Sequence, residues 1–91
     1  MADWQVYILE CADGSLYTGI ARDLNERVAT HNRGSGAKYT RSRLPVTLVY
    51  TETATDRSAA LRREIEIKKL QRLEKRDLVA SQQAIGAHRE R

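Results

Sequence analysis

Two β-rich runs that flank Asp13-Gly14 constrain the fold of this chain more than any other feature. Asp-Gly between apolar segments is a strong signal for a β-hairpin. The two strands should cover about Trp4 to Cys11 and about Leu16 to Ile20, as an antiparallel pair. The hairpin therefore brings Tyr7 and Tyr17 onto neighbouring strands.

The length of the turn decides where these two tyrosines point. A two-residue loop at Asp13-Gly14 would place the rings on opposite faces of the sheet. A three-residue loop that starts at Ala12 pairs Tyr7 with Gly19 instead, and both rings then share one face. We expect this second register, because a glycine closes the loop in the left-handed conformation without a steric cost. Taken alone, the hairpin is better explained by two tyrosines that only pack, and it is the residues further along the chain that favour a functional role.

A short helix is predicted from Leu24 to about Asn32, ending at Gly34. Asp23 is its expected N-cap, and a glutamate three positions on gives a pattern that resembles a capping box. Arg27 and His31 are one helical turn apart, so their side chains should be neighbours on one surface.

The segment from Arg33 to Arg43 is predicted to be a loop, because of its Gly34-Ser35-Gly36. Basic side chains around one aromatic residue suit contact with a phosphate backbone, although a solvated, flexible loop would have the same composition. The candidate nucleic-acid contacts here are Arg33, Lys38, Tyr39, Arg41 and Arg43. The formal net charge of +4 also suits a polyanionic partner.

Pro45 opens a third predicted strand, Val46 to about Thr51. Its alternation indicates one well-buried face that carries Val46, Leu48 and Tyr50. A long helix should follow from a cap at Thr55 or Asp56.

The long helix should run to Leu70, and a third helix should cover about Leu73 to Ala80. The third helix is expected to bury Leu73, Leu78 and Val79. We therefore predict one domain over residues 1–81, followed by a polar, basic and disordered tail over residues 82–91, in which His88 is incidental.

A carboxylate stands in the middle of the apolar arc of the long helix. At about 100° per residue, this arc is formed by Ala60, Leu61, Ile65, Ile67 and Leu70. Glu64 falls inside it with Lys68 beside it, whereas Glu66 faces water. An ionised carboxylate that faces a core is costly unless it is paired or binds a metal. The alternative to a functional site is a Glu64–Lys68 ion pair at the rim of the sheet, which contributes a few tenths of a kcal/mol.

Length and cysteine content narrow the class of protein. A chain of 91 residues leaves little room for a deep ligand cavity, so its chemistry should lie on an exposed face. The single Cys11 cannot form an internal disulfide, and no apolar run reaches membrane-spanning length. We expect a soluble protein of the cytoplasm with no membrane partner.

The ordered set of these residues resembles the GIY-YIG nuclease family, most of all its small stand-alone bacterial members, over about Trp4 to Leu73. The two signatures are present as Gln5-Val6-Tyr7, where the family's glycine is lost, and Tyr17-Thr18-Gly19. The resemblance implies an α/β fold of α+β type, a three-stranded antiparallel sheet flanked by helices, and cleavage of DNA with a divalent metal. It also implies a catalytic set of Tyr7, Tyr17, Arg27, His31 and Glu64. The chain departs from the family in having no asparagine after Glu64, where several members carry one.

The chemistry of these side chains suits the reaction. Glu64 would supply an oxygen ligand for Mg²⁺ or Mn²⁺, and Arg27 can fork onto non-bridging phosphate oxygens. The resemblance implies that Tyr7 is the base, that His31 receives or relays the proton, and that Tyr17 positions water or phosphate, although the two tyrosines could exchange roles. A tyrosine base needs a pKa well below its usual value of about 10, and both the metal and Arg27 are expected to lower it. Lys68 is a further candidate for a phosphate contact.

The expected substrate is DNA, branched or single-stranded, in repair or recombination. Two other functions explain part of the sequence. A nucleic-acid-binding module without cleavage would account for the charge but not for the inward Glu64. A nuclease subunit that is active only with a protein partner would account for the lack of an appended DNA-reading domain in 91 residues.

Overall fold

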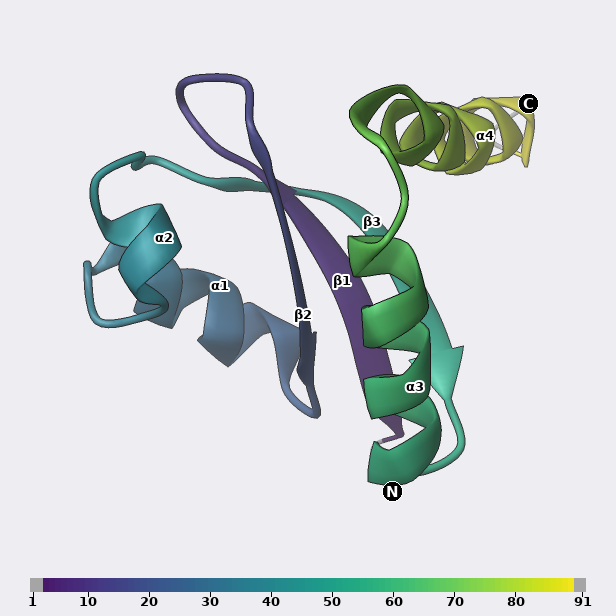
Figure 1. Cartoon of the computed structure of the whole chain (residues 1–91), viewed down its shortest axis with the longest axis horizontal. Coiled ribbons are helices and arrows are strands. Elements are labelled where there is room, and N and C mark those ends of the chain that lie inside the picture. Colours follow the sequence, from purple (N-terminus) through teal and green to yellow (C-terminus); the bar gives the residue numbers. More distant parts are fainter. Residues whose placement is uncertain (1–2, 90–91) are drawn as a thin grey trace.

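A three-stranded antiparallel sheet with helices on both faces forms the protein, in a computed structural model that describes residues 3–89, with side chains as far as Gln82. The elements are β1 (Trp4–Glu10), β2 (Leu16–Ala21), α1 (Leu24–Asn32), α2 (Lys38–Arg41), β3 (Thr47–Ala54), α3 (Arg57–Lys68) and α4 (Arg72–Arg89). The strand order is β2-β1-β3, so β2 is an edge strand. Helices α1 and α2 lie on one side of the sheet, and α3 and α4 on the other (Figure 1). The predicted α+β fold class is confirmed. Within residues 3–89, none of the helices combines the length and apolar character needed to cross a bilayer.

The hairpin has the predicted three-residue loop. Tyr7 pairs with Gly19 across the β1–β2 ladder. The backbone N–H of Cys11 donates to the carbonyl of Ser15 at 2.8 Å, and Gly14 has a φ of 85°. This is the left-handed conformation that a glycine adopts without a steric cost, so the turn chemistry sets the register. Both tyrosines consequently face the same side of the sheet.

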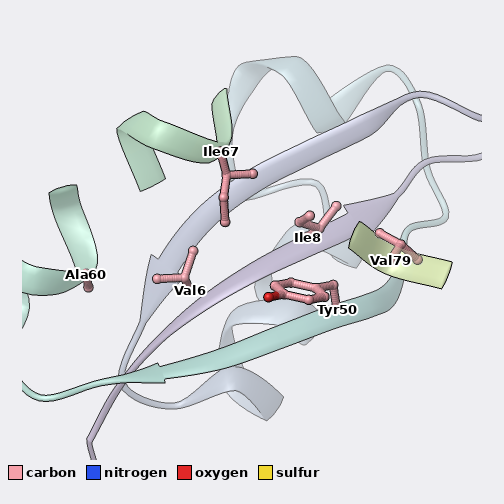
Figure 2. Packing of buried hydrophobic residues seen from close by; sticks show 6 residues of the cluster. All are labelled: Val6, Ile8, Tyr50, Ala60, Ile67 and Val79. Atoms are coloured by element: carbon pink, nitrogen blue, oxygen red, sulfur yellow. The ribbon is translucent and has the colours of Figure 1, made fainter. Parts of the chain in front are cut away.

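Each face of the sheet carries its own hydrophobic layer. The layer under α3 and α4 is formed by Val6, Ile8, Tyr50, Ala60, Ile67 and Val79 (Figure 2). The layer under α1 and α2 is formed by Tyr7, Leu9, Cys11, Ala21 and Val46. Alternate residues of β1 therefore belong to opposite layers, as strand geometry requires. Because Tyr7 is a member of the second layer, that layer determines where its phenol lies.

The third strand differs from its prediction, because a β-bulge interrupts its alternation. It spans Thr47–Ala54, and its register on β1 shifts between Ile8 and Leu9. An extra residue in a strand reverses which face the following side chains take. Val46 therefore packs in the Tyr7 layer and Tyr50 in the other, while Leu48 is 38% exposed. The expectation of one well-buried face shared by these three residues is wrong.

Helix α3 starts where expected and buries a narrower arc than expected. Asp56 is the N-cap, and its carboxylate accepts from the N–H of Ala59 at 2.8 Å. The helix ends at Lys68 rather than at Leu70. Ile65 is 52% exposed, which corrects its predicted burial.

The buried face of α3 is formed by Ala60 and Ile67, both 0% exposed. Glu64 lies between them, four residues after the first and three before the second, and these spacings put all three on one side of the helix. The position of Glu64 inside the apolar arc is therefore as predicted.

Helix α4 is longer than predicted and runs from Arg72 to Arg89. Leu73 is 77% exposed, contrary to prediction, whereas Val79 is buried. At about 100° per residue, Leu73 points some 120–140° away from the stripe that carries Leu78 and Val79. The chain from residue 82 to Arg89 continues this helix. The side chain of His88 and residues 90–91 lie outside the described part of the chain.

The predicted basic loop contains one helical turn, α2, and is tied to the hairpin. The Arg43 guanidinium donates to the Asp13 carboxylate at 3.1 Å and to the Tyr39 carbonyl at 2.7 Å. The amide side chain of Asn32 makes two hydrogen bonds with the backbone of Val46, at 3.1 and 2.8 Å. These contacts hold the segment against the sheet, so the alternative of a flexible, solvated loop is not supported.

Helix α1 begins at its predicted cap. The N–H of Glu26 donates to the Asp23 carboxylate at 3.1 Å. The Glu26 carboxylate faces Arg33 at 3.3 Å rather than returning to the cap, so only half of a capping box forms. The helix ends before Gly34, whose φ is 83°. Arg27 and His31 then project from one side of α1.

Candidate active site

Three rings from three different elements meet on the α1 side of the sheet. Tyr7 on β1 and Tyr17 on β2 have ring centroids 6.4 Å apart. His31 on α1 lies 6.1 Å from the first ring and 5.3 Å from the second, edge-on in both cases. The Tyr7 hydroxyl is 3.1 Å from Nε2 of His31. The register of the hairpin and the docking of α1 together produce this cluster.

Two glycines make room for these rings. A Cβ atom on Gly19 would lie 2.5 Å from the Tyr7 hydroxyl oxygen and 2.7 Å from Cζ. A Cβ atom on Gly36 would overlap the imidazole of His31. The close approach of backbone to ring therefore excludes side chains at both positions. Gly36 was predicted only to be part of a loop, although Gly34-Ser35-Gly36 is a pattern that also allows a close approach of the backbone.

Hydrogen bonds around His31 set its tautomer. The Thr40 hydroxyl donates its one proton to the carbonyl of Ala37 at 2.9 Å. Its oxygen must then accept from Nδ1 of His31, also at 2.9 Å. The neutral imidazole therefore carries its proton on Nδ1, and Nε2 accepts from the hydroxyl of Tyr7. Thr40 is fully buried, and no sequence signal had marked it.

Burial dominates the ionisation of Tyr7. Burial and the neighbouring Tyr17 raise the pKa of Tyr7 to about 12, against the lowering effect of Arg27. The predicted lowering by Arg27 is therefore present, but in the protein alone the burial of the phenol outweighs it. Burial also lowers the pKa of His31 below 6.5, and the positive charge of Arg27 lowers it further. At neutral pH the pair consists of a protonated phenol and a neutral imidazole.

An open cavity of about 430 Å³ adjoins the rings. Tyr17, Arg27 and His31 line it together with Glu26, Thr30, Ser35, Gly36 and Ala37. Arg27 is exposed, and its guanidinium lies close enough to Tyr7 to lower the pKa of that phenol. A guanidinium, a phenol and an imidazole that line one cavity form a surface suited to a phosphate group.

Glu64 reaches the site from the opposite layer. Its side chain is 16% exposed and forms an ion pair with Lys68 at 3.2 Å. Its negative charge contributes to the raised pKa of Tyr7. The predicted rim pair and the predicted inward position are thus both present. An ion pair this exposed stabilises the fold by only a few tenths of a kcal/mol. This contribution is too small to explain why a carboxylate lies among apolar residues.

The donors at the site suit a hard cation held by a single carboxylate. Within residues 3–82 no three His, Cys, Asp or Glu side chains gather to form a metal cage. Mg²⁺ is commonly bound by one or two carboxylates, with water and phosphate completing its shell. The carboxylate of Glu64 therefore fits such an ion, which would be shared with the substrate.

The predicted nucleic-acid contacts separate into three groups. Tyr39 lies beside the site, and its ring stacks with that of Tyr17 at a centroid distance of 6.2 Å. Lys68 forms an ion pair with Glu64. Arg33 and Arg43 are used in ion pairs with Glu26 and Asp13. Lys38 and Arg41 are exposed on α2.

Gly19→Ala should destabilise the fold and displace the phenol of Tyr7. The added methyl group cannot fit, and overpacking of this kind costs about 1–3 kcal/mol. Chemical denaturation followed by circular dichroism measures the loss. The double variant Gly19→Ala/Tyr7→Leu is the control, because the shorter side chain should recover part of the free energy. An alanine variant as stable as the parent would contradict the close approach.

Comparison with known proteins shows the family to which this chain is related. The GIY-YIG catalytic domain matches residues 3–77. A UPF0213 protein of Staphylococcus epidermidis is 58% identical over 74 residues, which cover 81% of this chain and 90% of that one. A UPF0213 protein of Natronomonas pharaonis is 54% identical over 81 residues, covering 89% and 95%.

Two solved structures have the same fold. The solution structure of UPF0213 protein BH0048 from Bacillus halodurans is 47% identical, with a TM-score of 0.56, and the match covers 86% of this chain and 83% of that one. The solution structure of protein EF2693 from E. faecalis is 35% identical, with a TM-score of 0.57 and coverage of 90% and 88%. The predicted resemblance is confirmed, and the chain belongs to the GIY-YIG family.

Proposed function

We propose that this protein is a metal-dependent endonuclease that hydrolyses phosphodiester bonds in DNA. The observation that carries the proposal is the hydrogen-bonded series Tyr7, His31 and Thr40, which adjoins a cavity lined by Arg27. The series offers a route for a proton, and the guanidinium offers a binding site for phosphate. The charge of Glu64 lies within reach of the same phenol. A domain that only bound nucleic acid would require no such proton route.

In the proposed reaction, a water molecule in the cavity attacks the phosphorus, and the bond between phosphorus and the leaving sugar oxygen breaks. The proton of the attacking water passes to the hydroxyl oxygen of Tyr7 as the proton of Tyr7 moves to Nε2 of His31. The leaving sugar oxygen takes its proton from a second water molecule. The high pKa of Tyr7 makes a standing phenolate rare at neutral pH, so this concerted relay replaces a simple tyrosine base. Arg27 stabilises the charge that develops on the non-bridging oxygens, and Tyr17 orients the phosphate or the water.

Glu64 would hold the divalent ion, Mg²⁺ or Mn²⁺, which supplies charge stabilisation at the phosphate when bound. Thr40 orients the imidazole but touches no reacting atom. The asparagine that several family members carry is absent after Glu64, and none of these roles depends on it. With DNA as the substrate, the cytoplasm is the expected location.

A nicking assay tests the proposal directly. Supercoiled plasmid is incubated with the full chain and Mg²⁺ or Mn²⁺, with an EDTA control, and relaxed and linear products are separated on a gel. Metal-dependent nicking that EDTA abolishes is the expected result. A set of single-stranded, duplex, flapped and branched oligonucleotides then defines the preferred structure. Binding without cleavage of any of these substrates would overturn the proposal.

Cleavage should be lost on acidification only below pH 6.5. Proton acceptance requires neutral His31, and its pKa is lowered from 6.5 by burial and by Arg27. The acid limb of the pH–rate profile, which His31 controls, should therefore be centred below pH 6.5. The free energy of unfolding should also fall below pH 6.5, because the unfolded state binds the proton more readily than the folded state. Single-turnover rates from about pH 5 to 9 provide the measurement. An acid limb centred above pH 6.5 would show that His31 does not receive the proton.

A further inference from the structure

A second cavity adjoins the cavity lined by Tyr17, Arg27 and His31, which is called the catalytic cavity below. An open cavity of about 330 Å³ is lined by Leu16, Tyr17, Thr18, Tyr39, Lys68 and Lys75. A smaller one of about 180 Å³ is lined by Ser15, Leu16, Tyr39, Arg72 and Lys75. The two share three lining residues, so they form one groove. Tyr17 lines both this groove and the catalytic cavity, which joins them at the edge strand β2.

Three basic side chains line the groove. Lys68 at the end of α3, and Arg72 and Lys75 on the first turns of α4, supply three cations. Neither set of lining residues contains an acidic side chain. Lys68 is paired with Glu64, whereas no ion pair joins Arg72 or Lys75 to another side chain of the described residues. These charges suit the phosphates of a polyanion.

The groove is also lined by apolar and aromatic side chains, beside the hydroxyls of Ser15 and Thr18. Tyr39 is 40% exposed, and its ring stacks with that of Tyr17 at an interplanar angle of 23°. The guanidinium of Arg43 lies 3.9 Å from the Tyr39 ring centre and holds this ring in place. Leu16 continues the apolar surface. Fixed aromatic rings together with cations are typical of surfaces that bind single strands, because unpaired bases can contact the rings.

We propose that this groove binds the single-stranded nucleic acid next to the scissile phosphate. The inference rests on the proposed nuclease function and adds to it a substrate class, DNA with an unpaired segment beside the cut. The strand leaves the catalytic cavity at Tyr17, crosses the β2 edge over Leu16 and Tyr39, and ends against Arg72. In a duplex, paired bases are turned away from such rings, so phosphate contacts alone would remain.

The double variant Arg72→Ala/Lys75→Ala tests the groove without cleavage. Binding is measured by fluorescence anisotropy in the inactive Glu64→Gln background, with a labelled oligothymidine of about 12 nucleotides. A blunt hairpin duplex of the same number of nucleotides is the comparison. We expect the affinity for the single strand to fall about tenfold or more at low salt, with the slope of log K against log salt reduced by about 0.7 for each lost phosphate contact.

The control variant is Arg62→Ala/Lys69→Ala, which removes the same charges from exposed positions outside the groove lining. It should leave the single-strand affinity within about twofold of the parent. Unchanged single-strand binding in the groove variant, or an equal loss for the duplex, would overturn the proposal.

The outcome can be separated from that of the nuclease proposal. If the parent chain cuts DNA but the groove variant binds single strands normally, the groove is excluded and the nuclease stands. If the parent chain cuts nothing and the groove variant loses single-strand binding, the groove stands and the nuclease function fails.

Discussion

Glu64→Gln should lower the cleavage rate by about three orders of magnitude or more while the fold stays intact. The amide keeps the size of the carboxylate but removes the charge that would hold the divalent ion, and a metal contributes several kcal/mol to such a transition state. Neutralising a side chain that is 16% exposed between two buried neighbours should not destabilise the protein. Plasmid nicking under single-turnover conditions gives the rate, and circular dichroism checks the fold.

Glu66→Gln is the matched control for this experiment. It lies on the same helix two residues further on, and its side chain is 66% exposed. It loses the same charge at a position that faces solvent, so cleavage should change by less than about twofold. A folded Glu64→Gln variant that cuts at the parent rate would eliminate the metal-dependent mechanism.

Tyr7→Phe should slow cleavage by about 100- to 10,000-fold, because it removes the atom that exchanges protons with water and with His31. It should also destabilise the fold by about 1–3 kcal/mol, since Nε2 of His31 loses its hydrogen-bond partner inside the protein. The rate is measured at saturating enzyme, and the free energy of unfolding by denaturant titration. The activity loss should persist where the variant is fully folded.

Tyr50→Phe separates the two effects. Tyr50 is buried in the opposite layer (Figure 2). Its hydroxyl donates to the carboxylate of Glu52. The pKa of Tyr50 is also raised to about 12 by burial. This variant should lose a comparable part of its stability and keep its cleavage rate. Equal losses of activity in the two variants would mean that Tyr7 acts only through the fold.

Local chemistry made the hairpin and the helix starts predictable. Gly14 set the register that puts both tyrosines on one face, and Asp23 and Asp56 cap the helices they precede. Helical periodicity was sufficient to find Glu64, because a charge among apolar positions stands out at 3.6 residues per turn.

Features that depend on contacts between distant residues were not predictable. The β-bulge in β3 comes from fitting one strand against another, so the alternation around Tyr50 was misleading. Thr40 carries no motif, and its role follows only from the docking of α2 against His31. The direction of the pKa shift of Tyr7 depends on how deeply the ring is buried, which could not be predicted from the sequence. The basic lining of the groove depends on the position of α4 relative to α3, because Lys68 lies on α3 whereas Arg72 and Lys75 lie on α4.

The two hydrophobic layers have a consequence for the proposed activity. Tyr7 is packed in one layer, and Glu64 belongs to helix α3, which packs on the other. The two groups that the proposed reaction brings together are therefore positioned relative to each other only through the sheet. Enlarging Ala60 or trimming Ile67 would tilt α3 and move the carboxylate by a fraction of an ångström without touching a phenol. The cleavage rate would then fall well before the protein unfolded. Substitutions far from the tyrosines would therefore have the same effect on the rate as substitutions of catalytic residues.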